Sequence, residues 1–486
     1  MRRNVLIFLL VVVSLLLLAA CAQQAATPQV IRETVVVTQV VEQEKVVTQV
    51  VEKEKVVTQV VEVTPVAGRC APTSFEELGD NPIKIGVPIP LSAPGSVTGG
   101  RAMQTAVNIA VKEVNDAGGV LGKYPVDVVF YDTSGLPERG TAGMEYLITS
   151  ECVVAVIGEY HSAAGLTEKE VANKYHVPVI FAETWNDQIT ASQYPEVFRI
   201  APASSMVAQA DAKYLSDVGV SFVAIVAENT DYGIPASEQT KERLAELDID
   251  SEIYLAEQGA QEFGALIAKI EEDMRGKEGL KAVLVLITGE TSYNFEQQAA
   301  EQGLMPREDV VGIANQVAYN ADEFWQNVPD GNYYAFRRVG VVPALTKDNP
   351  VATRFVEAYK NELGRFPESY AFEAYDAFML MIKAIEKANS LDPDAIIEAL
   401  ESFDSRENGV QLAQGVYYFP YGTKNPVPDD QPAWMWHQWP DPAVLFLQYW
   451  QEGQSAEEAC VVWPKQYQTC GDVYWIQPGT EPPVKP

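Results

Sequence analysis

Few residues of this chain have the types and spacing that covalent catalysis needs. Histidine occurs three times, at positions 161, 176 and 437. The sequence contains neither a G-x-S-x-G nucleophile motif nor an H-E-x-x-H zinc motif. No C-x-x-C pair is present, so neither a zinc site nor a redox centre is supported. The sequence therefore predicts no catalytic residue, no metal site and no cofactor, and an extracellular hydrolase is the least supported function.

Polar and aromatic side chains suited to holding a solute follow the predicted strands. Glu183 and Trp185 come after an apolar run that ends at Phe181. A carboxylate can pair with an ammonium or amidinium group, and an indole ring can stack on a flat or cationic ligand. The alternative is a surface glutamate and a tryptophan that packs between lobes. Because open parallel sheets bind ligands at the carboxyl ends of their strands, the candidate ligand-binding residues are those that follow strands: Ser162, Glu183, Thr184, Trp185, Tyr232, Thr288, Glu290 and Asn315.

The N-terminal residues have the pattern of a targeting segment. Arg2 and Arg3 precede an apolar run over 5–18, which is short for a membrane span and typical of a signal-peptide core. The run ends in Leu-Ala-Ala-Cys at 18–21, which resembles a bacterial lipobox. We therefore expect residues 1–20 to be a lipoprotein signal peptide and Cys21 to be diacylated, with a non-lipidated signal peptide as the alternative. This places the protein outside the cytoplasm, anchored to the cell membrane through Cys21, on the periplasmic or outer face.

Four cysteines remain if Cys21 carries lipid. An even number in an oxidising compartment indicates two disulfides, with three connectivities open. Cys460 and Cys470 are close enough in sequence to close a short loop, so we pair them. Cys70 and Cys152 then pair by elimination.

Composition excludes some partners. The formal net charge of −32 predicts repulsion from nucleic acid and from anionic lipid headgroups. A length of 486 residues with 47% hydrophobic composition is enough for two or more domains. The charge itself is typical of a soluble exported protein.

Residues 21–80 are predicted to form a stalk between the lipid and the folded domain. Positions 36–65 contain three copies of a ten-residue unit, VVTQVVEQEK, VVTQVVEKEK and VVTQVVEVTP. Ten residues match neither a heptad nor an eleven-residue repeat, so no stable coiled coil is implied. Self-association of the valine pairs is an alternative.

Strand and helix patterns alternate from about Asn81 onward. Short apolar strands separated by helices predict an α/β fold with parallel sheets covered on both faces. Two sets of similar size, divided near Pro202, indicate two lobes with a cleft between them. The predicted strands cover 83–87, 126–131, 153–158 and 177–181 in the first set, and 222–226, 252–254, 282–287 and 310–313 in the second.

Several segments carry a family resemblance over about residues 81–465. The segment VNDAGGVLGK at 114–123, followed by VDVV at 126–129 and Asp132, resembles the N-terminal signature of branched-chain amino-acid-binding proteins. These are type I periplasmic binding proteins of ABC transporters. AFEAYDA at 371–377 and the strand pair around WQEGQ at 450–454 resemble later signatures of the same family. The resemblance implies two Rossmann-like lobes joined by a hinge of crossing strands, a small-molecule solute and an ABC transporter permease as partners.

The resemblance also implies roles for some of the candidates. Ser162 would open a helix and hold a ligand carboxylate, with a plain N-cap as the alternative, and Thr184 would supply a hydroxyl. Tyr232 would cover the ligand from the second lobe. Thr288 and Glu290 lie where the family contacts the ligand's side chain, and Asn315 lies near its usual acidic group. Glu183 and Trp185 are larger than the family's residues at this loop.

These expectations predict a lipoprotein that binds an amino acid or a related amide or amine for an ABC transporter. A ligand-sensing subunit with the same fold is the alternative. We expect hinges near Pro202, Val341 and Gly415. The predicted divisions are 81–202 with 340–410 for lobe 1, 203–339 with 411–475 for lobe 2, and 476–486 for a tail.

Overall fold

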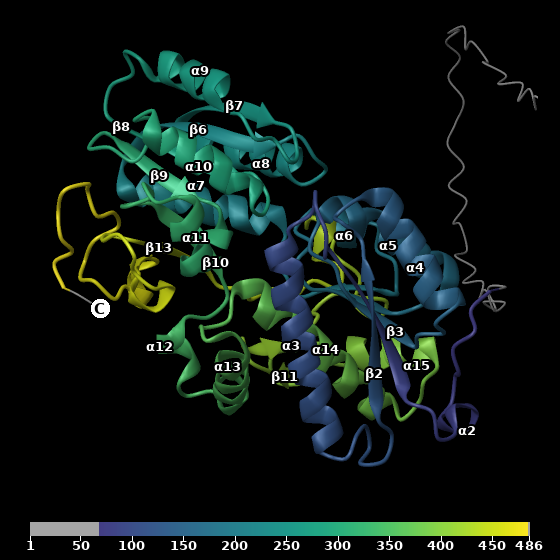
Figure 1. Ribbon diagram of the computed structural model, residues 1–486. Helices are drawn as coiled ribbons and strands as arrows, with labels where there is room; N and C mark the ends of the chain where they lie inside the picture. The colour runs from purple at the N-terminus through teal and green to yellow at the C-terminus, as the bar shows by residue number, and fades with distance from the viewer. Residues whose placement is uncertain (1–67, 485–486) are drawn as a thin grey trace, which may run out of the picture. The chain divides into compact units, whose positions relative to one another are not determined.

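A computed structural model describes residues 68–484 of the chain (Figure 1). The predictions for the signal peptide, for lipidated Cys21 and for the repeats at 36–65 lie outside the described residues. Within residues 68–484, no helix is both long and apolar enough to cross a membrane. Over the same range, no cluster of histidine, cysteine and acidic side chains is arranged to hold a metal ion.

The first sheet has five parallel strands in the order β2-β1-β3-β4-β5. Its apolar strands are covered on both faces: Met144 of α4 and Val171 of α5 belong to one core, and Met103 of α3 and Phe378 of α14 to the other. Figure 1 shows α3 and α14 side by side. This sheet and its helices are called lobe 1. Its elements are β1 (Ile83–Ile89), α3 (Val97–Asp116), β2 (Val126–Asp132), α4 (Pro137–Thr149), β3 (Ala155–Gly158), α5 (Ser162–Tyr175), β4 (Val179–Phe181), α6 (Gln188–Ala191), β5 (Val197–Arg199), α12 (Pro343–Thr346), α13 (Pro350–Leu363), α14 (Ser369–Ala388) and α15 (Pro393–Glu401).

The second sheet has seven strands in the order β14-β13-β10-β9-β8-β6-β7, in which β13 and β14 run antiparallel to their neighbours. Alternate residues of β6 face opposite layers: Val223 packs with α7 and α8, and Ala224 packs with α9 and α10. This sheet and its helices are called lobe 2. Its elements are α7 (Ser204–Val218), β6 (Val220–Glu228), α8 (Gly233–Ala245), β7 (Asp250–Ala256), α9 (Gly264–Met274), β8 (Leu280–Leu286), α10 (Thr291–Glu301), β9 (Val310–Ala314), η2 (Gln316–Tyr319), α11 (Ala321–Asn327), β10 (Ala335–Val339), β13 (Val444–Gln448), η4 (Ala456–Glu458), β14 (Cys460–Trp463) and η5 (Lys465–Tyr467).

The predicted α/β class with parallel sheets is confirmed. Each strand expected between 83 and 313 overlaps a strand of the structure, because a run of branched apolar residues bounded by turn signals is a strong local signal. Helix ends also follow the sequence. Asn349 caps α13 by accepting hydrogen bonds from the N–H groups of Val351 and Ala352, and Gly364 ends it with φ +73°.

Three segments connect the lobes. The first follows β5, the second follows β10, and the third runs from Trp439 to β13. They lie together: the Gly340 N–H donates to the Ala443 carbonyl (2.7 Å), and the Trp439 N–H donates to the Arg199 carbonyl (3.0 Å). The first two match the expected hinges near Pro202 and Val341. Gly415, expected as the third hinge, instead lies in the turn of a hairpin formed by β11 (Val410–Gln411) and β12 (Val416–Tyr417).

The aromatic segment after this hairpin packs on lobe 1, although we assigned 411–475 to lobe 2. His437 stacks on Phe198 with ring centroids 3.9 Å apart. Trp436, which follows η3 (Ala433–Met435), donates its indole N–H to the Tyr194 carbonyl (3.1 Å). The chain enters lobe 2 only at β13, because this segment first completes the core next to β5.

Both predicted disulfides, Cys70–Cys152 and Cys460–Cys470, are present. The first joins a segment assigned to the stalk to the start of β3 in lobe 1. The neighbouring short helix α2 (Phe75–Leu78) also packs on lobe 1, since Phe75 stacks on Tyr124 (4.4 Å between centroids) and Leu78 is buried. Folded structure therefore begins before residue 81.

Candidate functional site

A small cavity lies where loops from both lobes meet, at the carboxyl ends of strands of both sheets. Its volume is about 30 Å³, room for about two water molecules. A solute of metabolite size therefore enters only if the lobes part. The lining residues are Tyr160, His161, Ser162, Ala163, Glu183 and Trp185 from lobe 1, and Glu228, Thr230, Tyr232, Gln258, Thr288, Asn315, Gln316 and Arg337 from lobe 2.

Ser162 opens α5 directly after β3, as the sequence predicted. Its hydroxyl oxygen accepts hydrogen bonds from the backbone N–H groups of Trp185 and Asn186, each at 3.1 Å. These bonds fix the loop after β4 against the start of α5. The hydroxyl hydrogen is left to donate, and the first N–H groups of an α-helix have no partner within the helix. This corner is therefore suited to an acidic ligand group.

Glu183 is buried with 3% exposure and faces the cavity. Its Oε1 accepts a hydrogen bond from the Gln316 side chain of lobe 2, and its carboxyl group also interacts with the carboxyl group of Glu373 on α14. Burial raises the pKa of Glu183 to about 7, against the opposing effect of hydrogen bonds. The carboxyl therefore shifts between its neutral and charged forms near neutral pH.

The two residues after Glu183 differ in where they point. Trp185 lines the cavity and meets Tyr232 edge to face, with ring centroids 6.0 Å apart. Its indole N–H is buried and interacts with the carboxyl group of Glu183. Thr184 does not line the cavity; its methyl group lies against Gly165 of α5. Side chains therefore alternate along this loop: Glu183 and Trp185 face the cavity, and Thr184 between them faces α5.

The lobe 2 candidates are similarly divided. Tyr232, Thr288 and Asn315 line the cavity. The Asn315 amide is occupied by structural bonds, because it donates to the Ile287 carbonyl (2.7 Å) and accepts from the Val317 N–H (3.0 Å). Glu290 lies outside this lining and accepts a hydrogen bond from the Thr98 N–H of α3 (2.5 Å). It therefore forms a contact between the lobes.

Sequence reasoning missed two charged residues of the cavity, Glu228 and Arg337. Glu228 ends β6 and is 1% exposed, and burial raises its pKa to about 7. Arg337, on β10, forms an ion pair with Asp211 (3.5 Å between Nη1 and Oδ2) and donates to the Val285 carbonyl (3.2 Å). A glutamate at the end of the apolar run VSFVAIVA was the available signal for the first. Two adjacent arginines within AFRRV were the signal for the second.

His161 is held in a structural role. Its Nε2 accepts a hydrogen bond from the Ser96 N–H (2.9 Å), which connects the loop before α5 to the start of α3. Burial lowers its pKa to about 4. The imidazole is therefore neutral at physiological pH.

Comparison with known proteins agrees with this architecture. The chain is 24% identical over 324 residues to the Leu/Ile/Val-binding protein homolog 1 of Brucella abortus, covering 66% of this chain and 82% of that protein. The structure is similar to that of a leucine-binding protein from Thermotoga maritima (TM-score 0.64, 23% identity, 76% and 96% of the two chains). It also resembles a solute-binding protein from R. palustris in complex with benzoate (TM-score 0.61, 18% identity, 77% and 94%).

The family model described as periplasmic binding protein matches residues 82–419. This range contains both sheets apart from β13 and β14, and it contains every residue of the cavity. The chain belongs to the periplasmic binding protein family.

Proposed function

We propose that this protein is the solute-binding subunit of an ABC transporter, which closes its two lobes around a small polar metabolite and presents it to a permease. The observation that carries the proposal is the cavity itself. Ser162 and Trp185 of lobe 1 and Tyr232 of lobe 2 line one space, at the sheet ends where open α/β folds bind ligands. The proposed solute is an amino acid or a related amide or amine.

Binding of this kind requires no chemistry, only a change in the population of closed molecules. The three segments between the lobes are short and hydrogen-bonded to one another, so they can bend together while each sheet stays rigid. A solute that contacts both lobes favours the closed form by the free energy of those contacts. The permease then recognises the closed form.

The start of α5 supplies a site for an acidic group of the solute. Ser162 can donate its hydroxyl hydrogen, and the helix end adds N–H groups and a partial positive charge. Trp185 and Tyr232 would enclose the apolar part of the solute.

The experiment is a thermal-shift screen of amino acids, amides, amines and small acids, followed by small-angle X-ray scattering with each hit. We expect a hit to raise the melting temperature and to reduce the radius of gyration. Ser162→Ala should weaken the binding of a carboxylate-bearing hit by about tenfold, from the loss of one hydrogen bond to a charged group. Hits that leave the radius of gyration unchanged would contradict closure around the solute.

We further propose that Cys21 anchors the protein to the membrane by diacylation. The supporting observations are the Leu-Ala-Ala-Cys sequence and the apolar run before it. The full chain expressed in a bacterial host should partition into the detergent phase of Triton X-114, and the Cys21→Ser variant should move to the aqueous phase. Equal partitioning of the two would exclude the anchor.

A further inference from the structure

Two buried carboxyl groups from opposite lobes face the same cavity. Glu183 follows β4 of lobe 1, and Glu228 ends β6 of lobe 2. Neither carboxyl has a cationic partner within residues 68–484: the neighbours of Glu183 are Gln316, Trp185 and the carboxyl of Glu373, and those of Glu228 are the threonines Thr230 and Thr288. Burying a carboxylate without a positively charged partner is costly, and neither glutamate has such a partner among the residues that line the cavity with it. The closed cavity therefore favours a positive charge between them.

The nearby arginine does not supply that charge to the carboxyls. Arg337 lines the cavity, but its guanidinium forms an ion pair with Asp211. Both side chains are 1% exposed, so the two charges stay together. The hydrogen bond to Glu183 comes from the neutral amide of Gln316. The cavity therefore has a surplus of negative charge when both glutamates are ionised.

The aromatic lining suits a cation as well. Tyr160, Trp185 and Tyr232 line the cavity together with the two glutamates. The faces of aromatic rings attract ammonium and guanidinium groups, more strongly when water is excluded. Aromatic rings and carboxylates around one enclosed space are a common arrangement for binding organic cations.

We propose that the cavity binds a solute of net positive charge, with an ammonium or guanidinium-type group held between Glu183 and Glu228. This inference rests on the proposed function and specifies its solute. The cation contacts a carboxyl group of each lobe and thereby favours the closed form. A solute that combines this group with a carboxylate would still place the carboxylate at the start of α5.

Protonation is the competing way to neutralise the two carboxyls. Burial raises the pKa of each to about 7, so a bound cation displaces protons, and affinity should increase as pH rises from about 6 to about 8. Other ionisable groups surround the pair and stay unchanged in the variants below: Glu373, Arg338 and Asp376 behind Glu183, and Tyr160, His161, Asp211, Tyr232 and Arg337 around the cavity.

The test is calorimetric titration of the purified protein with four probes: agmatine, L-arginine, L-leucine and benzoate. We expect agmatine or L-arginine to bind more tightly than L-leucine and benzoate, with affinity higher at pH 8 than at pH 6. Glu183→Gln and Glu228→Gln should each weaken that binding about 10- to 100-fold. Glutamine has nearly the same shape as glutamate, so each variant removes the negative charge and little else. The matched control is Glu257→Gln, an exposed lobe 2 residue hydrogen-bonded to Asn229, which should bind as the wild type does.

Three results would overturn the inference. L-leucine or benzoate binding more tightly than both cations would show a neutral or anionic solute and leave the proposed function intact. Glutamine variants that bind the cation as tightly as the wild type would place it elsewhere. No change in melting temperature with any solute of any charge would count against both proposals. Circular dichroism of each variant separates lost binding from lost folding.

Discussion

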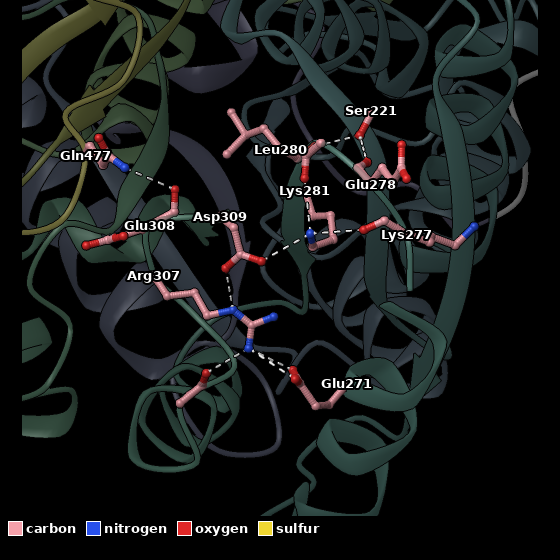
Figure 2. Close-up of polar contacts among 12 residues, drawn as sticks. Ser221, Glu271, Lys277, Glu278, Leu280, Lys281, Arg307, Glu308, Asp309 and Gln477 are labelled. Carbon is pink, nitrogen blue, oxygen red and sulfur yellow. Dashed lines mark hydrogen bonds and ion pairs between the residues drawn. The ribbon is translucent and has the colours of Figure 1, made fainter. Parts of the chain in front are cut away.

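The two edges of the lobe 2 sheet differ in whether their charged side chains form ion pairs. At the amino edge, where β8 and β9 begin, Lys281 contacts Asp309 (3.1 Å), and Arg307 joins Asp309 to Glu271 (2.8 and 3.0 Å) (Figure 2). At the carboxyl edge, where β6 ends, Glu228 has hydroxyl and backbone neighbours from Thr230 and Thr288 but forms no ion pair within residues 68–484. The charges of this cluster at the amino edge are therefore paired with one another, whereas Glu228 at the carboxyl edge has no cationic partner and faces the cavity.

The pKa values at the two edges shift in opposite directions. Burial alone would raise the pKa of Asp309, but hydrogen bonds and charges from Lys281 and Arg307 outweigh it, so that the pKa is lowered. At Glu228, burial prevails and raises the pKa to about 7. The same sheet thus holds one carboxylate firmly ionised and another close to its midpoint at neutral pH.

The largest expected effect is at Arg337, where an ion pair is fully buried. Arg337→Met should lower the free energy of unfolding by about 3–5 kcal/mol, because Asp211 is then buried without its partner. Urea denaturation checks this value. The double variant with Asp211→Asn should recover part of the loss, and a single variant as stable as the wild type would show that Asp211 is already neutral.

The next largest effect concerns how the free energy of unfolding depends on pH, for which Glu228 and Asp309 should differ. Because the pKa of Glu228 is raised from 4.5 to about 7, the folded protein retains a proton that the unfolded chain releases. The stabilisation is complete below about pH 4.5 and is lost as pH rises through about 7. Removing the group with Glu228→Gln should reduce the difference in unfolding free energy between pH 5 and pH 8 by about 1–3 kcal/mol. Asp309→Asn should not reduce it, since the lowered pKa of Asp309 places its titration below this window.

A smaller effect is expected for Tyr232, which closes the cavity from lobe 2. Tyr232→Ala should weaken the binding of an identified solute about tenfold, from the loss of its ring contacts. Tyr232→Phe keeps the ring and the edge-to-face contact with Trp185, so it should keep most of the affinity. Titration calorimetry of both variants tests the assignment, and equal affinity of Tyr232→Ala and wild type would remove Tyr232 from the site.

The smallest effect is expected at the amino edge. Arg307→Met should change the free energy of unfolding by less than about 1 kcal/mol, because its ion pairs are partly exposed to water. Solute affinity should stay the same. If Arg307→Met lowered the free energy of unfolding as much as Arg337→Met does, the ion pairs at the amino edge would be as important for stability as the buried pair.

The sequence was sufficient for the order of strands and helices and for six of the fourteen residues that line the cavity. Ser162 and Tyr232 were predictable because each follows an apolar strand, and strand ends converge in a parallel sheet. The two disulfides were predictable because few cysteines remained to pair. These inferences depend on local patterns that tertiary packing did not override.

Other features depend on distant contacts and could not be predicted. A glutamate at the end of a strand is usually solvated, so the burial of Glu228 could not be predicted from its position. Arg337 is tolerated inside a sheet because Asp211 of α7 lies next to it. Thr184 was misjudged by one position of loop register. The course of the chain after β12 was also hidden, because the fit of His437 against Phe198 depends on tertiary packing.

The disulfide between Cys70 and Cys152 has a mechanical consequence. Tension on the chain that precedes Cys70 is transmitted through the sulfur atoms to the start of β3 and bypasses α2 and β1. The load therefore falls on the half of the molecule that contains Ser162, and the half that contains Tyr232 remains free to swing. In a tethered molecule, lobe 1 would stay fixed with respect to the point of attachment while lobe 2 moves.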